Sequence, residues 1–233
     1  EDYAKAILDT ELSGKIAGIL HTINDSLADV VQSDETKILY GNDYFYENLL
    51  GLKFKISAFS FFQTNSKGAE KLYSVVREYA GDTSGKVVFD LYCGTGTIGQ
   101  IMSEGSKKVI GIEIVEEAIK DAKRNAALNK LDNVEFYVGK AEEVVPKMYK
   151  EGKRANVVVV DPPRKGCDEK VLDTIVSMEP DRVVYVSCNP STLARDLAYL
   201  NERGYKCHEI QPVDMFPHSV HVENVAWLSK ADN

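Results

Sequence analysis

One segment sets the architecture of the chain, and it reads Val87-Val88-Phe89-Asp90-Leu91-Tyr92-Cys93-Gly94-Thr95-Gly96-Thr97-Ile98-Gly99. Its apolar half predicts a buried strand, and its glycines predict a tight turn that opens a helix. Glycine lets the backbone approach a ligand closely, and the free amides at the start of the helix point toward that ligand. We therefore expect a ligand at Gly94 and Gly96. Taken alone the pattern is a weak signal, since a glycine turn can also simply pack a helix on a strand.

Strands and helices alternate on either side of this segment. Apolar spacing predicts helices over residues 66–79, 97–103, 116–129, 141–149, 169–178 and 191–203. Short apolar runs predict strands over residues 87–91, 108–112, 134–138, 156–160 and 182–186, then two consecutive strands near 207–213 and 220–228. This alternation requires parallel crossovers, so we expect an α/β fold with helices on both faces of a mostly parallel sheet. The last two strands predict an antiparallel addition at one edge.

The first 60 residues follow a different pattern. Apolar residues at helical spacing predict an amphipathic helix over residues 12–31. Strands at 38–40 and 44–46 are expected around a turn at Gly41-Asn42-Asp43, and a further strand at 53–59 follows Gly51. We therefore divide the chain into a small α+β piece, residues 1–60, and an α/β domain, residues 61–233.

The composition is that of an ordinary globular protein, with 44% hydrophobic and 27% charged residues. No apolar run approaches the roughly 20 residues that span a bilayer, and no signal-peptide pattern opens the chain. A cytoplasmic protein without a membrane partner is expected. The cysteines contain no C-x-x-C pair, which argues against a metal site or a disulfide framework and favours free thiols.

The net charge of −8 is unusual for a protein that binds nucleic acid, because phosphate binding leaves a basic footprint. Any basic surface would be local, or another part of a longer protein would carry it. The chain also begins at Glu1 without a methionine. An N-terminal domain missing from this sequence would explain both observations.

Carboxylates flank the predicted glycine turn. Asp90 precedes it, and Glu113 ends the next strand, where a carboxylate can hold ribose hydroxyls. A nicotinamide enzyme and a methyltransferase both fit this arrangement. Two details favour S-adenosylmethionine. Asp90 can face the cationic methionine end of that cofactor, and the rigid turn Asp161-Pro162-Pro163-Arg164 holds Asp161 at the carboxyl edge of the sheet, where ligands bind. For Asp161 a plain turn aspartate is the alternative.

A cysteine follows the fifth strand, in the run Ser187-Cys188-Asn189-Pro190. Asn189 suits a helix N-cap and Pro190 suits the first helical position, which places Cys188 ahead of a helix N-terminus. We expect this position to lower the pKa of the thiol from about 8.5 and to favour the thiolate. Taken alone, such a cysteine is more often a small core residue.

The motifs occur together and in one order, which is more specific than any of them alone. They are Phe61-Phe62-Gln63-Thr64-Asn65, the glycine segment, Asp161-Pro162-Pro163-Arg164-Lys165-Gly166, Ser187-Cys188-Asn189-Pro190, and Phe216-Pro217-His218 through His221-Val222-Glu223. This set resembles the RNA uracil-5-methyltransferase family, which modifies uridines of ribosomal and transfer RNA. The resemblance covers about Phe59 to Leu228. It implies a Rossmann-like class I methyltransferase fold with a seven-stranded sheet and an antiparallel edge strand.

The resemblance also implies roles for particular residues. Cys188 would be the nucleophile and Glu223 the base that removes a proton. The residues implied to hold S-adenosylmethionine are Gln63, Tyr92, Gly94, Gly96, Glu113 and Asp161. Residues 1–60 would be the end of a central RNA-binding region. The expected partner is RNA, and 23S ribosomal RNA rather than transfer RNA. The chain is expected to be a monomer. The chain lacks the oligonucleotide-binding barrel and the cluster-ligating cysteines of longer family members.

Three other functions fit part of the pattern. A nicotinamide-dependent dehydrogenase leaves Asp161-Pro162-Pro163 and Cys188 unexplained. An amino-group methyltransferase of nucleic acid uses an aspartate followed by prolines but needs no nucleophilic cysteine. A non-catalytic RNA-binding module is disfavoured by the negative charge.

Overall fold

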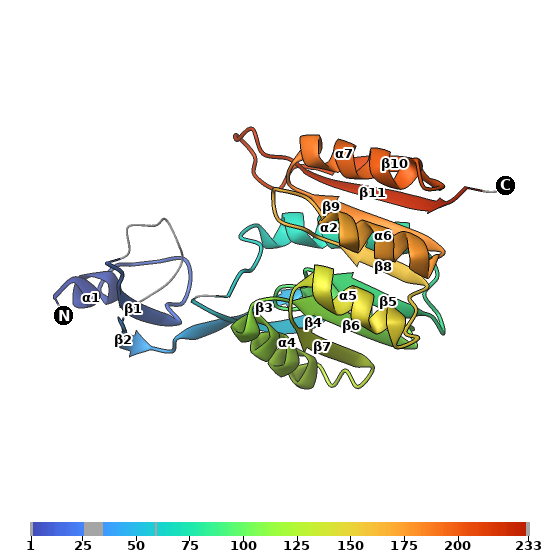
Figure 1. The fold of residues 1–233 in the computed structure, drawn as a ribbon. Coiled ribbons are helices and arrows are strands. Elements are labelled where there is room, and N and C mark those ends of the chain that lie inside the picture. Colours follow the sequence, from blue (N-terminus) through green and yellow to red (C-terminus); the bar gives the residue numbers. More distant parts are fainter. Residues whose placement is uncertain (1, 26–34, 59, 232–233) are drawn as a thin grey trace.

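The structure, a computed structural model, describes residues 2–25, 35–58 and 60–231. Within these residues an α/β body is built on a seven-stranded sheet of order β10-β11-β9-β8-β5-β6-β7, and a smaller N-terminal part extends from one side (Figure 1). The strands of this sheet are β5 (Val87–Leu91), β6 (Lys108–Glu113), β7 (Val134–Val138), β8 (Val157–Val160), β9 (Arg182–Ser187), β10 (Tyr205–Val213) and β11 (Glu223–Lys230). The predicted α/β fold is confirmed.

The sheet changes direction at one edge. Strands β5 to β9 run parallel to one another, whereas β11 lies antiparallel between β9 and β10. The predicted antiparallel addition at one edge is therefore confirmed, with β11 as the antiparallel strand and β10 as the outer strand of the hairpin. In the order β8-β5-β6, the strands that follow β5 in sequence lie on both sides of it: β6 and β7 on one side, β8 and β9 on the other. Ligands of open α/β sheets bind at such a point, beyond the carboxyl ends of the strands.

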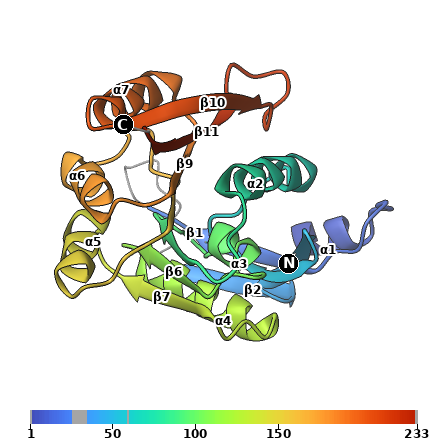
Figure 2. The ribbon, with the colours of Figure 1, turned by 90° about the vertical axis from the view of Figure 1, so that its right-hand side faces the viewer.

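Helices cover both faces of the sheet (Figure 2). The helices α2 (Ser66–Ala80), α3 (Thr97–Ile101) and α4 (Glu116–Leu128) lie on one face, and α5 (Ala141–Lys150), α6 (Glu169–Met178) and α7 (Pro190–Asn201) lie on the other. The predicted helices and strands of the body are all present, and their ends shift by at most three residues. Among the described residues, no helix combines the length and the apolar character needed to cross a bilayer.

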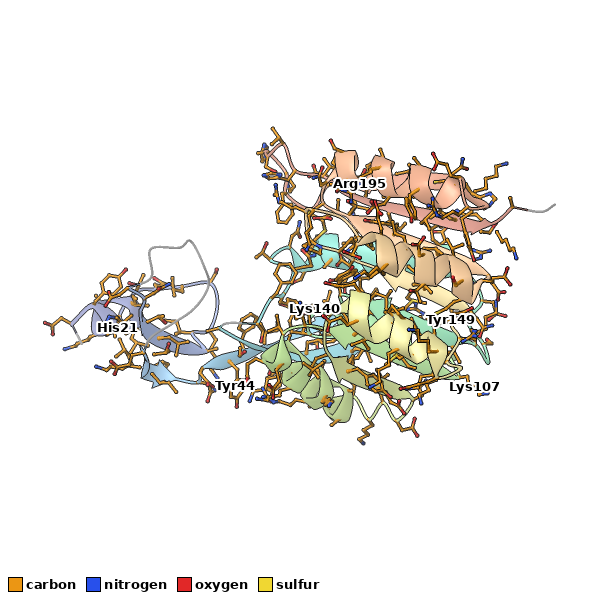
Figure 3. All side chains as sticks on the ribbon, viewed as in Figure 1. His21, Tyr44, Lys107, Lys140, Tyr149 and Arg195 are labelled. Atoms are coloured by element: carbon orange, nitrogen blue, oxygen red, sulfur yellow. The ribbon has the colours of Figure 1, made fainter. Side chains whose placement is uncertain are left out.

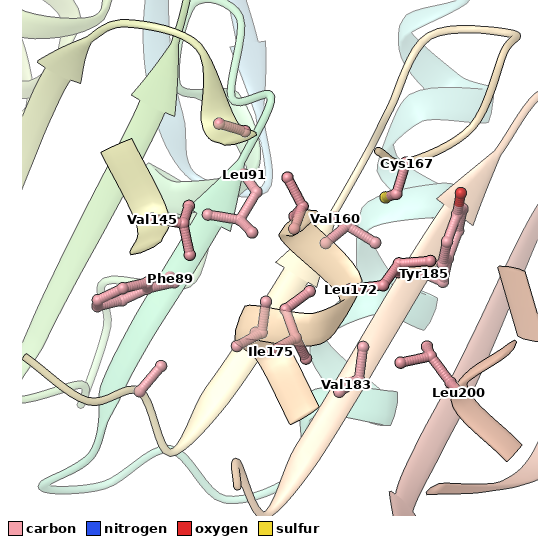
Figure 4. Close-up of a cluster of buried hydrophobic side chains, with 14 of the residues drawn as sticks. Phe89, Leu91, Val145, Val160, Cys167, Leu172, Ile175, Val183, Tyr185 and Leu200 are labelled. Carbon is pink, nitrogen blue, oxygen red and sulfur yellow. The ribbon is translucent and has the colours of Figure 1, made fainter. Parts of the chain in front are cut away.

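Strand β8 shows why the body folds this way. Its side chains alternate between the two layers, with Val158 and Val160 in the apolar cluster under α5, α6 and α7, and Val157 and Val159 in the cluster under α2 and α3. Figure 4 shows the first of these clusters. A strand that is buried on both faces has to be apolar at every position, and all four residues of β8 are fully buried valines.

The N-terminal part differs from the sequence-based prediction. It contains α1 (Asp2–Leu8) and the strands β1 (Gly18–Ile23), β2 (Glu35–Gly41), β3 (Tyr44–Leu49) and β4 (Leu52–Ser57). The helix expected over residues 12–31 is wrong, because residues 18–23 form a strand that pairs with β2, and the expected end beyond residue 25 lies outside the described residues. Periodicity alone misled here, since Ile19 and Ile23 also suit a strand that gains its hydrogen bonds from a distant partner.

The strands β2 and β3 are present but do not pair with each other around Gly41. Instead β1 pairs with β2, and β3 pairs with β4. The β3–β4 connection is Leu50-Gly51, and both residues have positive φ (48° and 85°), which is the conformation that a tight hairpin needs. Strand β4 ends at Ser57, and Phe59, at the end of the predicted strand, lies outside the described residues.

A polar stripe on α4 attaches this hairpin to the body. The Asn125 side chain accepts a hydrogen bond from the backbone N of Lys55 (2.8 Å) and donates to its carbonyl (3.2 Å), and Asn129 does the same with Lys53 (2.9 Å in both directions). One turn earlier, Asp121 accepts from the hydroxyls of Ser57 and Ser60. The two amides therefore satisfy the free edge of β4 as a neighbouring strand would.

Candidate active site

The carboxyl edge of the sheet gathers most of the predicted site residues. Parallel strands end at the same edge, so side chains that follow different strands become neighbours there. The residues at these strand ends are Tyr92 after β5, Glu113 at the end of β6, Asp161 after β8, and Cys188 after β9. Strand β11 runs the opposite way, and its first residue, Glu223, starts at this same edge.

Cys188 and Glu223 lie side by side. The last pair of the β9–β11 ladder joins Ser187 to Asn224, and in an antiparallel register the next two residues are Cys188 and Glu223. The Glu223 charge acts on the Cys188 thiol, in agreement with this proximity. The helix start is as predicted, because the Asn189 side chain caps α7 by accepting from the backbone N of Ser191 (3.1 Å), and Pro190 occupies the first turn.

The expected lowering of the Cys188 pKa is wrong. Burial raises the pKa of this thiol above its ordinary value, the Glu223 carboxylate raises it further, and the Arg164 guanidinium opposes both. Desolvation and the neighbouring anions thus outweigh the Arg164 charge. The pKa of Glu223 is also raised, by burial, and again Arg164 opposes the shift. A carboxyl with a raised pKa holds a proton more readily, which suits a base that must accept one.

The glycine turn is strained and held by a carboxylate. Tyr92, Gly94 and Gly96 all have positive φ (63°, 53° and 72°). The backbone N of Gly94 donates to one oxygen of Glu113 (3.0 Å), and the backbone N of Val115 donates to the other (2.9 Å). Glu113 therefore ties the end of β6 to the turn after β5. A Cβ at Gly94 would meet no atom within 4 Å, so the turn leaves open space at that point.

Gly96 has a packing role in the same turn. A Cβ there would lie 2.5 Å from the Phe136 ring, and the residue is the N-cap of α3 in the left-handed region. The close approach of α3 to β7 therefore requires glycine. Packing alone therefore explains why position 96 is a glycine. The open space at Gly94, in contrast, indicates room for a ligand.

Two aspartates lie beside the turn, and Asp161 is less deeply buried than Asp90. Asp90 is fully buried; its Oδ2 accepts from the backbone N of Gly99 (2.7 Å), and its Oδ1 has no hydrogen-bond partner among the described residues. Burial raises the pKa of Asp90 to about 7, with Glu113 adding to the shift. Burial raises the pKa of Asp161 to about 8, and the charges of Glu223 and Asp90 add to it. A buried acidic cluster with an orphaned oxygen fits a cationic group.

Sequence reasoning missed Tyr73. This residue of α2 is 5% exposed, its phenol hydrogen-bonds the Gln63 side chain, and Asp161, Asp90 and Glu223 all act on its charge. Burial, the largest cause, and these carboxylates raise the pKa of the phenol well above its ordinary value. Helical spacing places Tyr73 on the inward face of α2, but no motif distinguishes it from other core aromatics. Gln63 itself is 9% exposed and lies at this cluster.

The remaining predicted residues occupy distinct places. The Tyr92 phenol is half-buried and lies against Cys167 and the backbone of Asp168. Phe61 is 72% exposed, whereas Phe62 packs on Phe54, with ring centroids 6.0 Å apart. The Arg164 guanidinium also contacts Nδ1 of His221 (3.4 Å).

Solved structures share this fold. The crystal structure of Pyrococcus abyssi tRNA (uracil-54, C5)-methyltransferase in complex with S-adenosyl-L-homocysteine matches with a TM-score of 0.80 at 36% identity, over 92% of this chain and 51% of that chain. The fold, with its glycine turn and acidic strand ends, is that of a Rossmann-like methyltransferase.

The chain belongs to the tRNA (uracil-5-)-methyltransferase family, whose sequence model matches residues 9–231. It is 52% identical to an uncharacterized RNA methyltransferase of Clostridium tetani, over 100% of this chain and 50% of that protein. It is 53% identical to an uncharacterized RNA methyltransferase of Bacillus cereus, over 96% of this chain and 49% of that protein. The chain thus spans about half the length of the curated relatives it matches. The resemblance seen in the motifs is confirmed.

Proposed function

We propose that the chain is the catalytic part of an enzyme that transfers a methyl group from S-adenosylmethionine to carbon 5 of a uridine in RNA. The observation that carries the proposal is the placement of Cys188 beside Glu223 at the carboxyl edge of the sheet, next to a buried acidic cluster. Membership of the uracil-5-methyltransferase family supports it.

The proposed cofactor site is the space between the glycine turn and the aspartates Asp90 and Asp161. S-Adenosylmethionine would supply an electrophilic methyl group on a cationic sulfur. The orphaned oxygen of Asp90 and the acidic cluster around Asp161 fit its positive charge, and Glu113 at the end of β6 fits its ribose hydroxyls. The residues proposed to hold the cofactor are Gln63, Tyr92, Gly94, Gly96, Glu113 and Asp161.

The proposed chemistry at the uracil ring explains why a cysteine and a carboxylate must be neighbours. Carbon 5 of uracil is a weak nucleophile. When the Cys188 thiolate adds to carbon 6, the electron pair of the ring double bond moves toward carbon 5 and the adjacent carbonyl, and carbon 5 becomes nucleophilic. After methylation Glu223 removes the proton from carbon 5, the double bond forms again, and the bond between sulfur and carbon 6 breaks. The enzyme recovers its thiolate, and Glu223 passes its proton to solvent.

The raised pKa of Cys188 places one condition on this scheme. The thiol must lose its proton before it attacks, and the positive charge of Arg164 favours the thiolate. The target base must also leave its stack to reach a sulfur at a strand end, at a cost of a few kcal/mol that is smallest for unpaired RNA. We therefore propose a loop or single-stranded uridine as the target, and residues 1–60 as a part that contacts the RNA.

The proposed substrate is 23S ribosomal RNA, and the chain is proposed to act as a monomer. Transfer RNA is the second candidate, which the family description and the name of the Pyrococcus protein favour. Both RNAs therefore belong in the same assay.

The test is incubation of the complete protein with labelled S-adenosylmethionine and unmodified ribosomal or transfer RNA, followed by analysis of the labelled nucleoside. We expect 5-methyluridine. RNA with 5-fluorouridine should form a covalent adduct at Cys188, because fluorine cannot leave as a proton. Label in an amino-methylated nucleoside, with full activity of a Cys188→Ala variant, would instead support an amino-group methyltransferase.

A further inference from the structure

Side chains of α7 and its N-cap hold several backbone groups of the loop after β8. The Arg164 carbonyl accepts from the Asn189 side chain (3.0 Å) and from the Thr192 hydroxyl (3.2 Å). The Lys165 carbonyl accepts from the Arg195 guanidinium (2.9 Å). Consecutive loop residues thus depend on side chains from the first two turns of the helix that begins just after Cys188. Arg195, labelled in Figure 3, lies on this helix.

Asp196 is the centre of this attachment. Its carboxylate is 1% exposed, and one oxygen accepts from the backbone N of Cys167 (2.8 Å) and from the Tyr185 hydroxyl (2.6 Å). The other oxygen accepts from two nitrogens of Arg195 (2.8 and 2.7 Å). A single buried carboxylate therefore joins the loop, strand β9 and the side chain that holds Lys165. Such a charged group costs stability unless all its contacts are made, so its position is closely defined.

Gly166 shows how closely the loop approaches α7. A Cβ at this position would lie 2.4 Å from Nη2 of Arg195 and 2.6 Å from Oδ2 of Asp196, and φ is +80°. Only glycine allows the loop to reach the carboxylate. A cavity of about 500 Å³ is lined both by residues 165–170 and by Arg195, Asp196 and Tyr199 of α7, so a loop that lost its attachment would have room to move.

The loop carries the charge that acts on both proposed catalytic groups. Arg164 is the residue that favours the charged forms of Cys188 and of Glu223. It precedes the attached residues directly, and its own carbonyl is held by α7. The position of its guanidinium therefore depends on the attachment of the next three residues as well as on its contact with His221.

We propose that Asp196 is a positioning residue, which keeps Arg164 beside Cys188 and Glu223 by fixing residues 164–167 to α7. The inference rests on the proposed roles of Cys188 and Glu223. Asp196 itself lies under the loop and is not assigned any contact with RNA or cofactor.

The test measures the reactivity of the Cys188 thiol in the protein alone, without RNA or cofactor. Iodoacetamide labelling is followed against pH by peptide mass spectrometry, with Cys207 in the same chain as an internal reference. Asp196→Asn should shift the Cys188 profile to higher pH and slow labelling at pH 8 several-fold, while the Cys207 profile stays the same. Gly166→Ala, which displaces the loop but keeps the Asp196 carboxylate, should shift the Cys188 profile in the same direction. This variant replaces Asp196→Asn in the test if Asp196→Asn fails to fold.

Two comparisons separate positioning from general loosening. In an Arg164→Gln background, Asp196→Asn should have no further effect on the Cys188 profile, because the charge that it positions is gone. Asp173→Asn is the matched control, since that carboxylate also accepts from a tyrosine (Tyr199, 2.7 Å) and pairs with an arginine, but on the exposed side of α6.

The inference is overturned if Asp196→Asn and Gly166→Ala leave the Cys188 profile unchanged, or if Asp196→Asn shifts it equally with and without Arg164. These outcomes concern thiol reactivity and do not depend on methyl transfer. Failure of the proposed function would appear separately, as absence of 5-methyluridine from the RNA assay.

Discussion

Cys188 follows Ser187 and Glu223 precedes Asn224, so the two residues adjoin the last pair of the antiparallel ladder between β9 and β11. This neighbourhood depends on the direction of β11. A parallel strand in the same place would begin at the opposite edge of the sheet, and its first residue would lie far from the end of β9. The returning hairpin therefore brings the last motif of the chain to the nucleophile.

Replacement of Cys188 by alanine should abolish turnover and leave the fold intact. We expect methyl transfer to fall at least about 10³-fold, since loss of a covalent nucleophile removes the whole pathway. Thermal unfolding should change little, because the side chain is small and only partly buried. Tritium transfer from labelled S-adenosylmethionine measures the activity, and Cys207→Ala is the control. Normal activity of the Cys188 variant would contradict the covalent scheme.

Replacement of Glu223 by glutamine should have two opposite effects. Turnover should fall about 10²–10⁴-fold because the proposed base is lost. The Cys188 thiol should become more reactive, since the Glu223 charge is one cause of its raised pKa and removal of that charge moves the pKa down. Labelling with iodoacetamide at pH 8 should therefore be faster than in the wild type, by up to about tenfold for each unit of pKa. Slower labelling would show that the two groups do not interact as described.

Cofactor binding should be linked to proton release. Asp90 and Asp161 have pKa values of about 7 and about 8, so both are partly neutral at pH 7, and a cation should bind better when they are ionised. The charged or titratable groups around Asp161 include Asp90, Glu223, Tyr73 and Cys188. We expect affinity for S-adenosylmethionine to rise from pH 6 to pH 8.5. Calorimetry in buffers of different ionisation enthalpy should detect the released protons. Fewer protons should be released on binding of S-adenosylhomocysteine, whose sulfur is uncharged. Equal release with both ligands would argue against a role of the sulfonium charge.

The same pKa values predict that the folding stability of the protein without cofactor falls as pH rises, whereas its affinity for the cofactor rises. Both aspartates have folded pKa values above the ordinary 3.8, so the folded state holds protons that the unfolded state has lost. The stability that they contribute is therefore present at acid pH and is lost as pH rises from about 4 through about 8. An Asp161→Asn variant without cofactor should lose less thermal stability over this interval than the wild type, and should bind S-adenosylmethionine weakly. Identical pH profiles of the two proteins would contradict the assignment.

Loss of an α4 amide should loosen the free edge of β4, while the apolar residues Leu49, Phe54 and Ile56 keep the hairpin packed on the body. Asn125→Ala leaves the backbone N and carbonyl of Lys55 without their side-chain partner. An unsatisfied buried polar group costs about 1–3 kcal/mol, which urea unfolding can measure. Hydrogen exchange should speed up at the Lys53 and Lys55 amides first. Lys123→Ala, on the exposed face of the same helix, is the control, and an equal effect of both substitutions would show that the amide contacts contribute nothing specific.

Much of the body could be predicted because its pattern is local. The all-valine run of β8 and the alternating helices follow from burial on two faces, and Asn189 and Pro190 mark the start of α7 by their own backbone preferences. The N-terminal part failed because Ile19 and Ile23 fit either a helix or a strand. The strand formed because β2 supplied hydrogen bonds from another part of the chain.

The order of residues alone was enough to indicate the class of fold, the glycine turn and the cysteine that follows β9, because each depends on side chains within a few positions of one another. The pKa of Cys188, the buried phenol of Tyr73 and the contacts of Asp196 with the loop after β8 required folding in three dimensions. Each arises where strands and helices distant in sequence meet, and electrostatic effects depend on distance through space and on exclusion of water, which local patterns do not record.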